Sequence, residues 1–252
     1  METLKEKLNN PFDGLKGNPQ EFQKKCAEIA NELFKNYCIE CGEKKFALAE
    51  IEFYYFKEGE FKEKWNEKTY ERNPYDSSKL FYHLSGVDIC FKSELTKDKK
   101  GNKHGYGGGV LIRSMVEVNE NGEYLVDSDK YYKIIIGPLT CVNMMLNACN
   151  GNSMPKIEPI IISKRQNFTP KETYRYLGKN DFELIENEEK QKEKRETNID
   201  GSLKLAFYNP FGKKEEEIEK IWNHARSSYY SKRLEPNRDN KTNDNQTSKS
   251  KL

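Results

Sequence analysis

The sequence predicts a single domain of the α+β class, in which helices and strands occupy separate stretches of the chain. Residues 19–37 have apolar side chains at helical spacing, and the preceding Asn18 and Pro19 fit a cap and a first helical position. Residues 44–56 and several shorter runs instead have the aliphatic and aromatic character of buried strands. These apolar residues cluster between about positions 20 and 180, which is long enough for one sizeable core.

The remaining elements are predicted from shorter patterns. Strands are predicted over 80–84, 87–91, 110–115, 133–136, 160–162, 174–177 and 203–208. Ser85-Gly86 joins the first two of these, and the charged stretch 97–103 predicts another turn. Further helices are predicted over 139–146 and 215–230.

Both ends of the chain and one internal stretch are polar. We expect residues 1–18 to be a loose leader, because they are polar and contain Asn, Pro and Gly. The domain is predicted over 19–232, with a charged insertion near 186–200 and a disordered tail over 233–252.

Composition limits the function only loosely. The 252 residues include 43 basic and 41 acidic side chains, so the net charge of +2 neither demands nor excludes nucleic acid. The sequence shows no apolar segment typical of a signal peptide and no run of eighteen apolar residues, so we expect a cytoplasmic protein without a membrane partner, and we favour a monomer. Six cysteines are compatible with reduced thiols.

The strand over 44–56 carries two acids among apolar residues. Because strand side chains alternate between faces, we expect one face to hold the following six: Phe46, Leu48, Glu50, Glu52, Tyr54 and Phe56. Burying an unpaired carboxylate is costly, and two carboxylates this close repel unless a cation lies between them. Arg113, inside the apolar run 110–115, is the candidate cation.

Three short blocks resemble the alkyladenine (3-methyladenine) DNA glycosylase family. Ala49–Tyr54 is similar to that family's Glu-x-Glu-x-Tyr strand, Gly109–Met115 to its Arg-containing strand, and Gly137–Leu146 to its Gly-Pro-x-x-Leu helix start. The blocks follow the family's order, and the match covers about residues 45–150. The resemblance implies a curved, mainly antiparallel sheet flanked by helices. It also implies hydrolytic removal of a damaged or modified base from double-stranded DNA, as in base-excision DNA repair.

The resemblance also implies roles for individual residues. Glu52 would activate water, Arg113 would support it together with Glu50, and Tyr54 would stack on a base flipped out of the helix. Tyr82 and His83 are further substrate-binding candidates, because aromatic side chains can form the wall of a base pocket. A buried Glu–Arg pair in a sheet is, however, often only structural.

The chain also departs from the family. Arg72-Asn73-Pro74-Tyr75-Asp76 stands where the family has a His after the Glu strand, and His83, Ser85 and Asp88 fall near the places of its aromatic run and DNA-wedge Tyr. A non-catalytic nucleic-acid-binding module on the same scaffold is therefore the alternative. A protein for another ligand is a third hypothesis.

No cofactor and no metal are expected. Hydrolysis by a Glu-activated water requires neither a metal nor a Schiff-base lysine. Cys38 and Cys41 lack the second ligand pair of a zinc site, so a knuckle-like turn is expected there. The glycines of 105–109 are followed by no Lys-Ser/Thr, which favours close backbone approach over a phosphate loop.

Two basic groups could neutralise DNA phosphates or could simply be solvated surface. The first comprises Lys97, Lys99, Lys100, Lys103 and His104, and the second Lys164, Arg165, Lys171 and Arg175.

Overall fold

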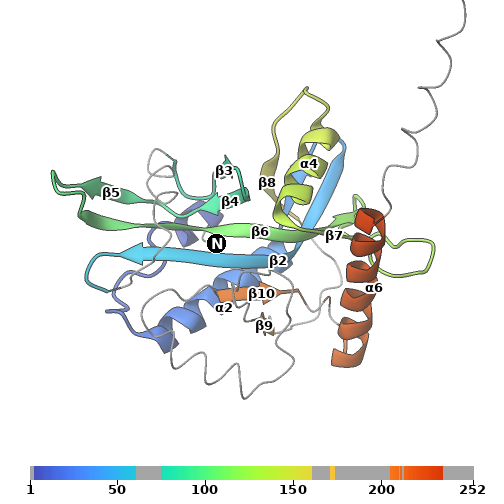
Figure 1. Cartoon of the computed structure of the whole chain (residues 1–252), viewed down its shortest axis with the longest axis horizontal. Helices are drawn as coiled ribbons and strands as arrows, with labels where there is room; N and C mark the ends of the chain where they lie inside the picture. The colour runs from blue at the N-terminus through green and yellow to red at the C-terminus, as the bar shows by residue number, and fades with distance from the viewer. Residues whose placement is uncertain are drawn as a thin grey trace, which may run out of the picture.

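The computed structural model describes residues 3–60, 75–160, 171–173, 205–209, 211 and 213–234. These residues form an α+β domain around one sheet of 10 strands that curls into a half-barrel (Figure 1). Its two long strands, β2 (Lys44–Lys57) and β6 (Lys103–Val118), pair along most of their length. The predicted fold class is thereby confirmed.

The shorter strands extend this pair on both sides. The order along the main path is β3-β4-β6-β2-β1-β8; in addition β5 and β7 pair with β6, β10 pairs with β2, and β9 pairs with β10. The pairings between these strands are antiparallel. Their bounds are β1 (Tyr37–Cys41), β3 (Leu80–His83), β4 (Gly86–Cys90), β5 (Glu94–Lys97), β7 (Ile134–Ile136), β8 (Lys156–Pro159), β9 (Lys171–Thr173) and β10 (Leu205–Tyr208).

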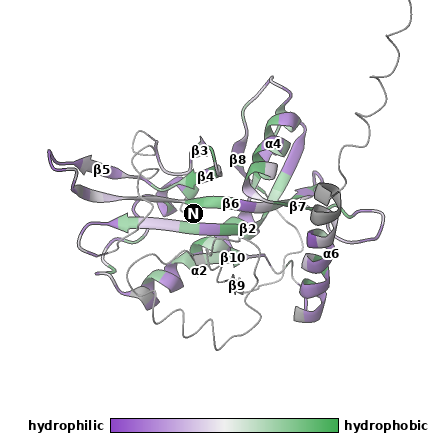
Figure 2. Ribbon diagram, in the orientation of Figure 1, coloured by the Kyte–Doolittle hydropathy of each residue, from purple (hydrophilic) through white to green (hydrophobic). Residues whose placement is uncertain are grey.

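Helices cover the two faces of the sheet unequally. The larger, first core receives α1 (Leu4–Lys7), α2 (Pro19–Asn36) and α4 (Pro138–Cys149), whereas α6 (Glu215–Leu234) packs on the smaller, second core. In Figure 2 the middle of β6 is hydrophobic, and the outer end of the β5–β6 hairpin is hydrophilic. The second core lies at one end of β2, around Ala47 and Ala49. Helix α6 therefore packs on that end of the second face and does not cover the rest of it.

Several predicted elements are confirmed. Asn18 caps α2 by accepting hydrogen bonds from the backbone N–H groups of Gln20 and Glu21, at 3.0 and 3.2 Å. β3 and β4 form the predicted hairpin, and the charged turn joins β5 to β6. The glycines lie inside β6 rather than before it: a side chain at Gly108 would place its Cβ 2.2 Å from the carbonyl oxygen of Tyr54. Close backbone approach is therefore the reason for glycine there.

The prediction of a loose leader over 1–18 is wrong for the described residues. Leu8 and Phe12 are fully buried in the first core, and the Phe12 ring lies 4.5 Å from that of Phe22. The apolar residues Leu4, Leu8 and Phe12 are spaced by four, so a short helix and the turn after it can direct them to one side. The frequent polar residues of this segment hid that spacing.

The knuckle-like turn predicted at Cys38 and Cys41 is also wrong. These residues lie in β1, which pairs with both β2 and β8. Because side chains alternate along a strand, Cys38 enters the second core and Cys41 the first. The two thiols therefore point to opposite faces and do not converge on one metal position.

An irregularity in β2 reverses the predicted facing of its acids. The register with β6 shifts between Leu48 and Ile51, where each strand has one residue without a direct partner. The first core receives Phe46 and Leu48 before the shift and Ile51, Phe53 and Tyr55 after it. The prediction that Glu50 and Glu52 share a face with Phe46 and Leu48 is therefore wrong, because a bulge interrupts strict alternation. The acids lie on the opposite face.

Some predictions fall outside the described residues. These are the strand over 174–177, most of the strand over 160–162, the charged insertion near 186–200, the tail from 235 onward and most of the second basic group. Among the described helices, none is long and apolar enough to cross a membrane.

Candidate functional site

Charged and aromatic side chains gather on the second face of the sheet, at the end of β2 that α6 does not cover. Glu50, Glu52 and Tyr54 come from β2, and Arg113 comes from β6 beside them. The structure thus brings together four of the six residues that the sequence singled out. A fifth, His83, lies beside Asp88, a residue of the same face that the sequence did not single out.

Arg113 contacts both buried carboxylates. Its guanidinium donates a hydrogen bond from Nη1 to Glu52 Oε2, and its Nε lies 3.6 Å from Glu50 Oε1. Ser114 donates to the other oxygen of Glu50, Oε2, at 3.2 Å. Burial opposes the charge on Arg113, but Glu52 and Glu50 outweigh it and hold the pKa of the guanidinium above its usual value. Glu50 and Glu52 are only 3% and 2% exposed, so this cation is what makes their burial tolerable.

The bulges in the two strands place these groups together. In β6 the alternation is interrupted at Arg113 and Ser114, so both side chains reach the acids of β2. The N–H of Gly137, just before α4, donates to the Arg113 carbonyl at 2.9 Å and ties the start of that helix to the same point. Gly137 has a φ of 100°, which glycine adopts without strain.

Tyr54 lies on the same face and is partly buried. Desolvation raises the pKa of its hydroxyl, and the carboxylates of Glu52 and Asp88 raise it further. The phenol is therefore neutral and can donate a hydrogen bond to an acid. Opposite Tyr54 on β6 is Gly109, which has no side chain to compete for space.

Asp88 is the residue of this face that the sequence analysis missed. It lies on β4, opposite Leu111 of β6, which is in turn opposite Glu52 of β2. Asp88 is fully buried, and its Oδ2 lies 3.1 Å from Nε2 of His83 on the neighbouring strand. The signal was present in the sequence: Asp88 is the single charged residue of the predicted strand over 87–91.

Tyr82 does not belong to this group. It precedes His83 on β3, so it points to the other face, and it packs against the first core. Desolvation raises the pKa of its hydroxyl, with smaller effects from Cys41 and Cys149. The prediction that Tyr82 lines the same pocket as Glu52 is therefore wrong, because adjacent strand residues face opposite sides.

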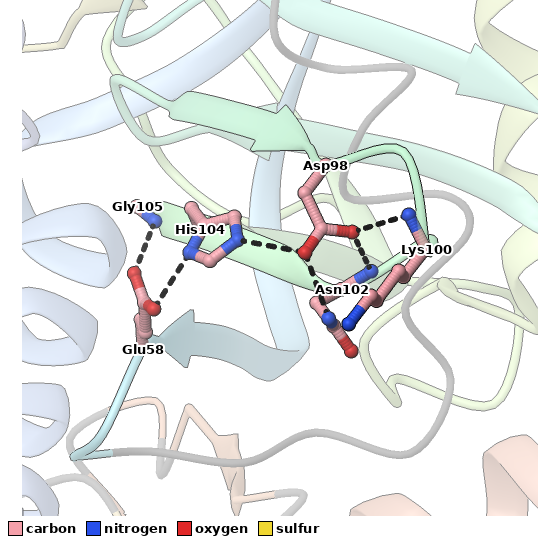
Figure 3. Close-up of polar contacts among 6 residues, drawn as sticks. All are labelled: Glu58, Asp98, Lys100, Asn102, His104 and Gly105. Atoms are coloured by element: carbon pink, nitrogen blue, oxygen red, sulfur yellow. Dashed lines mark hydrogen bonds and ion pairs between the residues drawn. The ribbon is translucent and has the colours of Figure 1, made fainter.

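Within the first basic group, the side chain of His104 contacts two acids near the turn of the β5–β6 hairpin (Figure 3). His104 Nδ1 lies 2.7 Å from Glu58 Oε1, and its Nε2 lies 3.6 Å from Asp98 Oδ2. Asp98 also accepts from the backbone N–H groups of Lys100 and Asn102, each at 2.8 Å. When His104 is protonated, its charge is thus paired with the carboxylates of Glu58 and Asp98.

One cluster in the described part of the chain has metal-ligand chemistry. Asp127, Asp129 and His224 can each bring one ligand atom within 4.8 Å of the others. His224 Nε2 lies 2.7 Å from Asp127 Oδ2, and the imidazole stacks on the Tyr131 ring with centroids 4.3 Å apart. These contacts connect α6 to the loop before β7, so the cluster also has a structural explanation.

No family model, curated protein or solved structure matches this chain. Five side chains define the chemistry of this sheet face: Glu50, Glu52, Tyr54, Arg113 and Asp88.

Proposed function

We propose that this chain is a monofunctional DNA-base N-glycosylase, an enzyme that hydrolyses the bond between a damaged or modified base and its deoxyribose. The observation that supports it is the buried Glu52, bound by Arg113 and flanked by Tyr54 on one sheet face. Two of the three sequence blocks that resemble glycosylases lie in β2 and β6, the strands that contribute these side chains.

The reaction needs one ionised carboxylate near the sugar. Glu52 accepts a proton from water while the water oxygen bonds to C1′, the C1′–N bond breaks, and its electron pair leaves with the base. The same negative charge offsets positive charge that develops on the sugar. Arg113 fixes the direction of the Glu52 carboxylate through its hydrogen bond, and Glu50 lies beside the Nε of the same guanidinium.

The base must leave the helix before this chemistry can occur. Tyr54 offers a ring on which a flipped base can stack. The β3–β4 hairpin adds a second feature: Leu84 in its turn is 94% exposed. An apolar side chain in this position suits insertion between base pairs, which unstacks them and favours extrusion of a nucleotide.

The test is release of free base from a panel of alkylated and deaminated duplex DNAs. We expect the wild type to release at least one base, and we expect Glu52→Gln to release none while it keeps its fold. Glu43→Gln, at an exposed glutamate in the turn between β1 and β2, is the matched control and should behave as wild type. Equal release by Glu52→Gln and wild type would overturn the assignment of Glu52.

One observation favours a second candidate, a non-catalytic nucleic-acid-binding module. Glu52 and Asp88 are both almost completely buried, so a base can reach them only after side chains on this face move. If these side chains never moved aside, the protein could bind DNA but could not hydrolyse the bond to the base. Such a module would show salt-dependent DNA binding that Glu52→Gln leaves unchanged, with no base released from any member of the panel.

A further inference from the structure

The outer end of the β5–β6 hairpin, residues 97–103, carries an unbalanced positive charge. This hairpin tip contains four lysines and one aspartate, an excess of three positive charges. The lysines are Lys97, Lys99, Lys100 and Lys103. Figure 1 shows the hairpin extending from the sheet at the end opposite α6, and Figure 2 shows that its outer end is hydrophilic. The charge is therefore displayed to solvent, away from both cores.

The strand register places like charges opposite each other at this end of the hairpin. Lys97 of β5 is the register partner of Lys103 of β6. Like charges directly opposite on paired strands destabilise the pairing, so this register costs the hairpin stability. A polyanion that binds here would relieve the repulsion, and the register therefore favours an anionic partner.

The turn between these strands is ordered, and its acid is bonded inward. The Asp98 carboxylate accepts from the backbone N–H groups of Lys100 and Asn102, each at 2.8 Å, and from Asn102 Nδ2 at 2.7 Å (Figure 3). The N–H of Gly101 donates to the Asp98 carbonyl at 3.0 Å. Lys99 and Lys100 are exposed, and neither forms an ion pair with another of the described residues. The turn thus holds two ammonium groups out to solvent on a fixed backbone.

The hairpin tip and the candidate site are joined by one strand, β6. Lys103 begins this strand, and Arg113 lies ten residues further along it. At about 3.3 Å per residue, the two positions are at most roughly 33 Å apart. A DNA duplex rises about 3.4 Å per base pair, so it covers that distance in about ten base pairs. One duplex can therefore contact the site and the hairpin tip at the same time.

We propose that the hairpin tip binds the phosphate backbone of duplex DNA, about ten base pairs from the nucleotide at the site. This inference rests on the DNA partner of the proposed function and adds a second contact surface to it. Lysine ammonium groups bind phosphates whatever the base sequence, so the hairpin tip positions the duplex and reads no base. It takes no part in the chemistry at Glu52.

The test is the salt dependence of binding to a DNA duplex of about 30 base pairs, long enough to span both contacts. Fluorescence anisotropy gives the affinity of the wild type and of Lys99→Gln/Lys100→Gln from about 50 to 200 mM salt. Each phosphate contact that is lost lowers the slope of log affinity against log salt by about one. Across this range the wild type should therefore lose roughly tenfold more affinity than the double variant.

Two controls separate a local contact from a change in net charge. Lys130→Gln/Lys133→Gln removes two exposed lysines from the loop that follows the other end of β6, and it should keep the salt dependence of the wild type. Base release gives a second readout. Because the hairpin tip lies far from Glu52, Lys99→Gln/Lys100→Gln should release base at the wild-type rate when the enzyme is in saturating excess, but it should need a higher concentration to saturate.

The outcomes distinguish this inference from the proposed function. Equal salt dependence in the wild type and Lys99→Gln/Lys100→Gln would overturn the inference and leave the glycosylase assignment standing, since the lysines would then only keep the edge strand β5 solvated. An equal effect of the control variant, or binding to phosphatidylserine vesicles but not to duplex DNA, would also overturn it. The expected change in salt dependence, with no base released by the wild type, would support the hairpin contact and contradict the proposed function.

Discussion

Arg113 is the cation that contacts two buried acids, Glu50 and Glu52, so its loss should be costly. In Arg113→Gln the carboxylates of Glu50 and Glu52 stay buried without their cation. We expect the free energy of unfolding to fall by about 3–5 kcal/mol, measured by urea denaturation at neutral pH.

The double variant Glu52→Gln/Arg113→Gln provides the control for that prediction. It removes one charge of each sign, so it should be clearly more stable than Arg113→Gln alone. A double variant as unstable as, or less stable than, Arg113→Gln would show that lost packing, rather than an uncompensated charge, dominates the effect.

Single residues also show what the sequence could and could not reveal about the site. Glu52, Arg113 and Tyr54 were recognisable because charged and aromatic side chains stood in strand blocks that resemble a known family. Tyr82 was misassigned because aromatic character does not reveal which face a strand residue occupies. Asp88 was overlooked because its importance depends on its alignment with Glu52 across β6, which only the register provides.

At the scale of the elements, the bulge in β2 decides which face the acids occupy. Asn209, just after β10, is fully buried and holds this bulge. Its N–H donates to the Ala49 carbonyl at 2.7 Å, and its Nδ2 donates to the Leu48 carbonyl at 3.2 Å and to the Tyr124 hydroxyl at 3.0 Å. The side chain thereby satisfies a carbonyl at the irregularity in the β2–β6 ladder.

Asn209→Ala should therefore destabilise the fold by about 1–3 kcal/mol, because the buried Leu48 carbonyl loses its side-chain donor. Thermal or denaturant unfolding measures this change, and Asn147→Ala, at an exposed position of α4, is the matched control. A loss no larger than that of the control would show that Asn209 does not support the bulge.

The bulge could not be predicted from the pattern of residues 44–56. Both faces of this strand carry large apolar side chains, so a reversal of alternation leaves no gap in the hydrophobic pattern. The existence of the strand, of the β3–β4 hairpin and of α2 was predictable, because periodicity and local caps determine them. The buried N-terminal segment and β1 depend on long-range packing that local patterns do not encode.

The turn end of the β5–β6 hairpin should respond to pH. Glu58 raises the pKa of His104, and His104 in turn lowers that of Glu58. Because the folded pKa of His104 lies above its unfolded value of 6.5, its contribution is complete below pH 6.5 and is lost as the pH rises through the folded pKa. The contribution of Glu58 also stabilises the fold, but it is complete above pH 4.5 and is lost as the pH falls through the folded pKa of Glu58.

We therefore expect amide protection at Gly105, which also donates to Glu58, to decrease as the pH rises above 6.5, after correction for intrinsic exchange. His104→Gln should abolish this dependence. An NMR titration that places the pKa of His104 at or below 6.5 would contradict the assigned contact.

At the scale of the whole molecule, the β3–β4 hairpin connects the buried site to Leu84, an exposed apolar residue in its turn. Leu84 and the pair His83–Asp88 belong to one hairpin, so the element that would enter DNA also carries part of the site. Leu84→Ala should slow base release from duplex DNA by about tenfold, because unstacking costs a few kcal/mol, but it should hardly affect release from single-stranded DNA. Equal slowing on both substrates would argue against a wedge.

The central claim is that Glu52 activates water for base release. Its most direct test is the single-turnover rate of excision by Glu52→Gln, measured with DNA affinity on the same preparation. We expect a rate at least about 10²-fold below wild type with affinity retained, because a general base typically contributes that much. A Glu52→Gln rate equal to that of the wild type would contradict it.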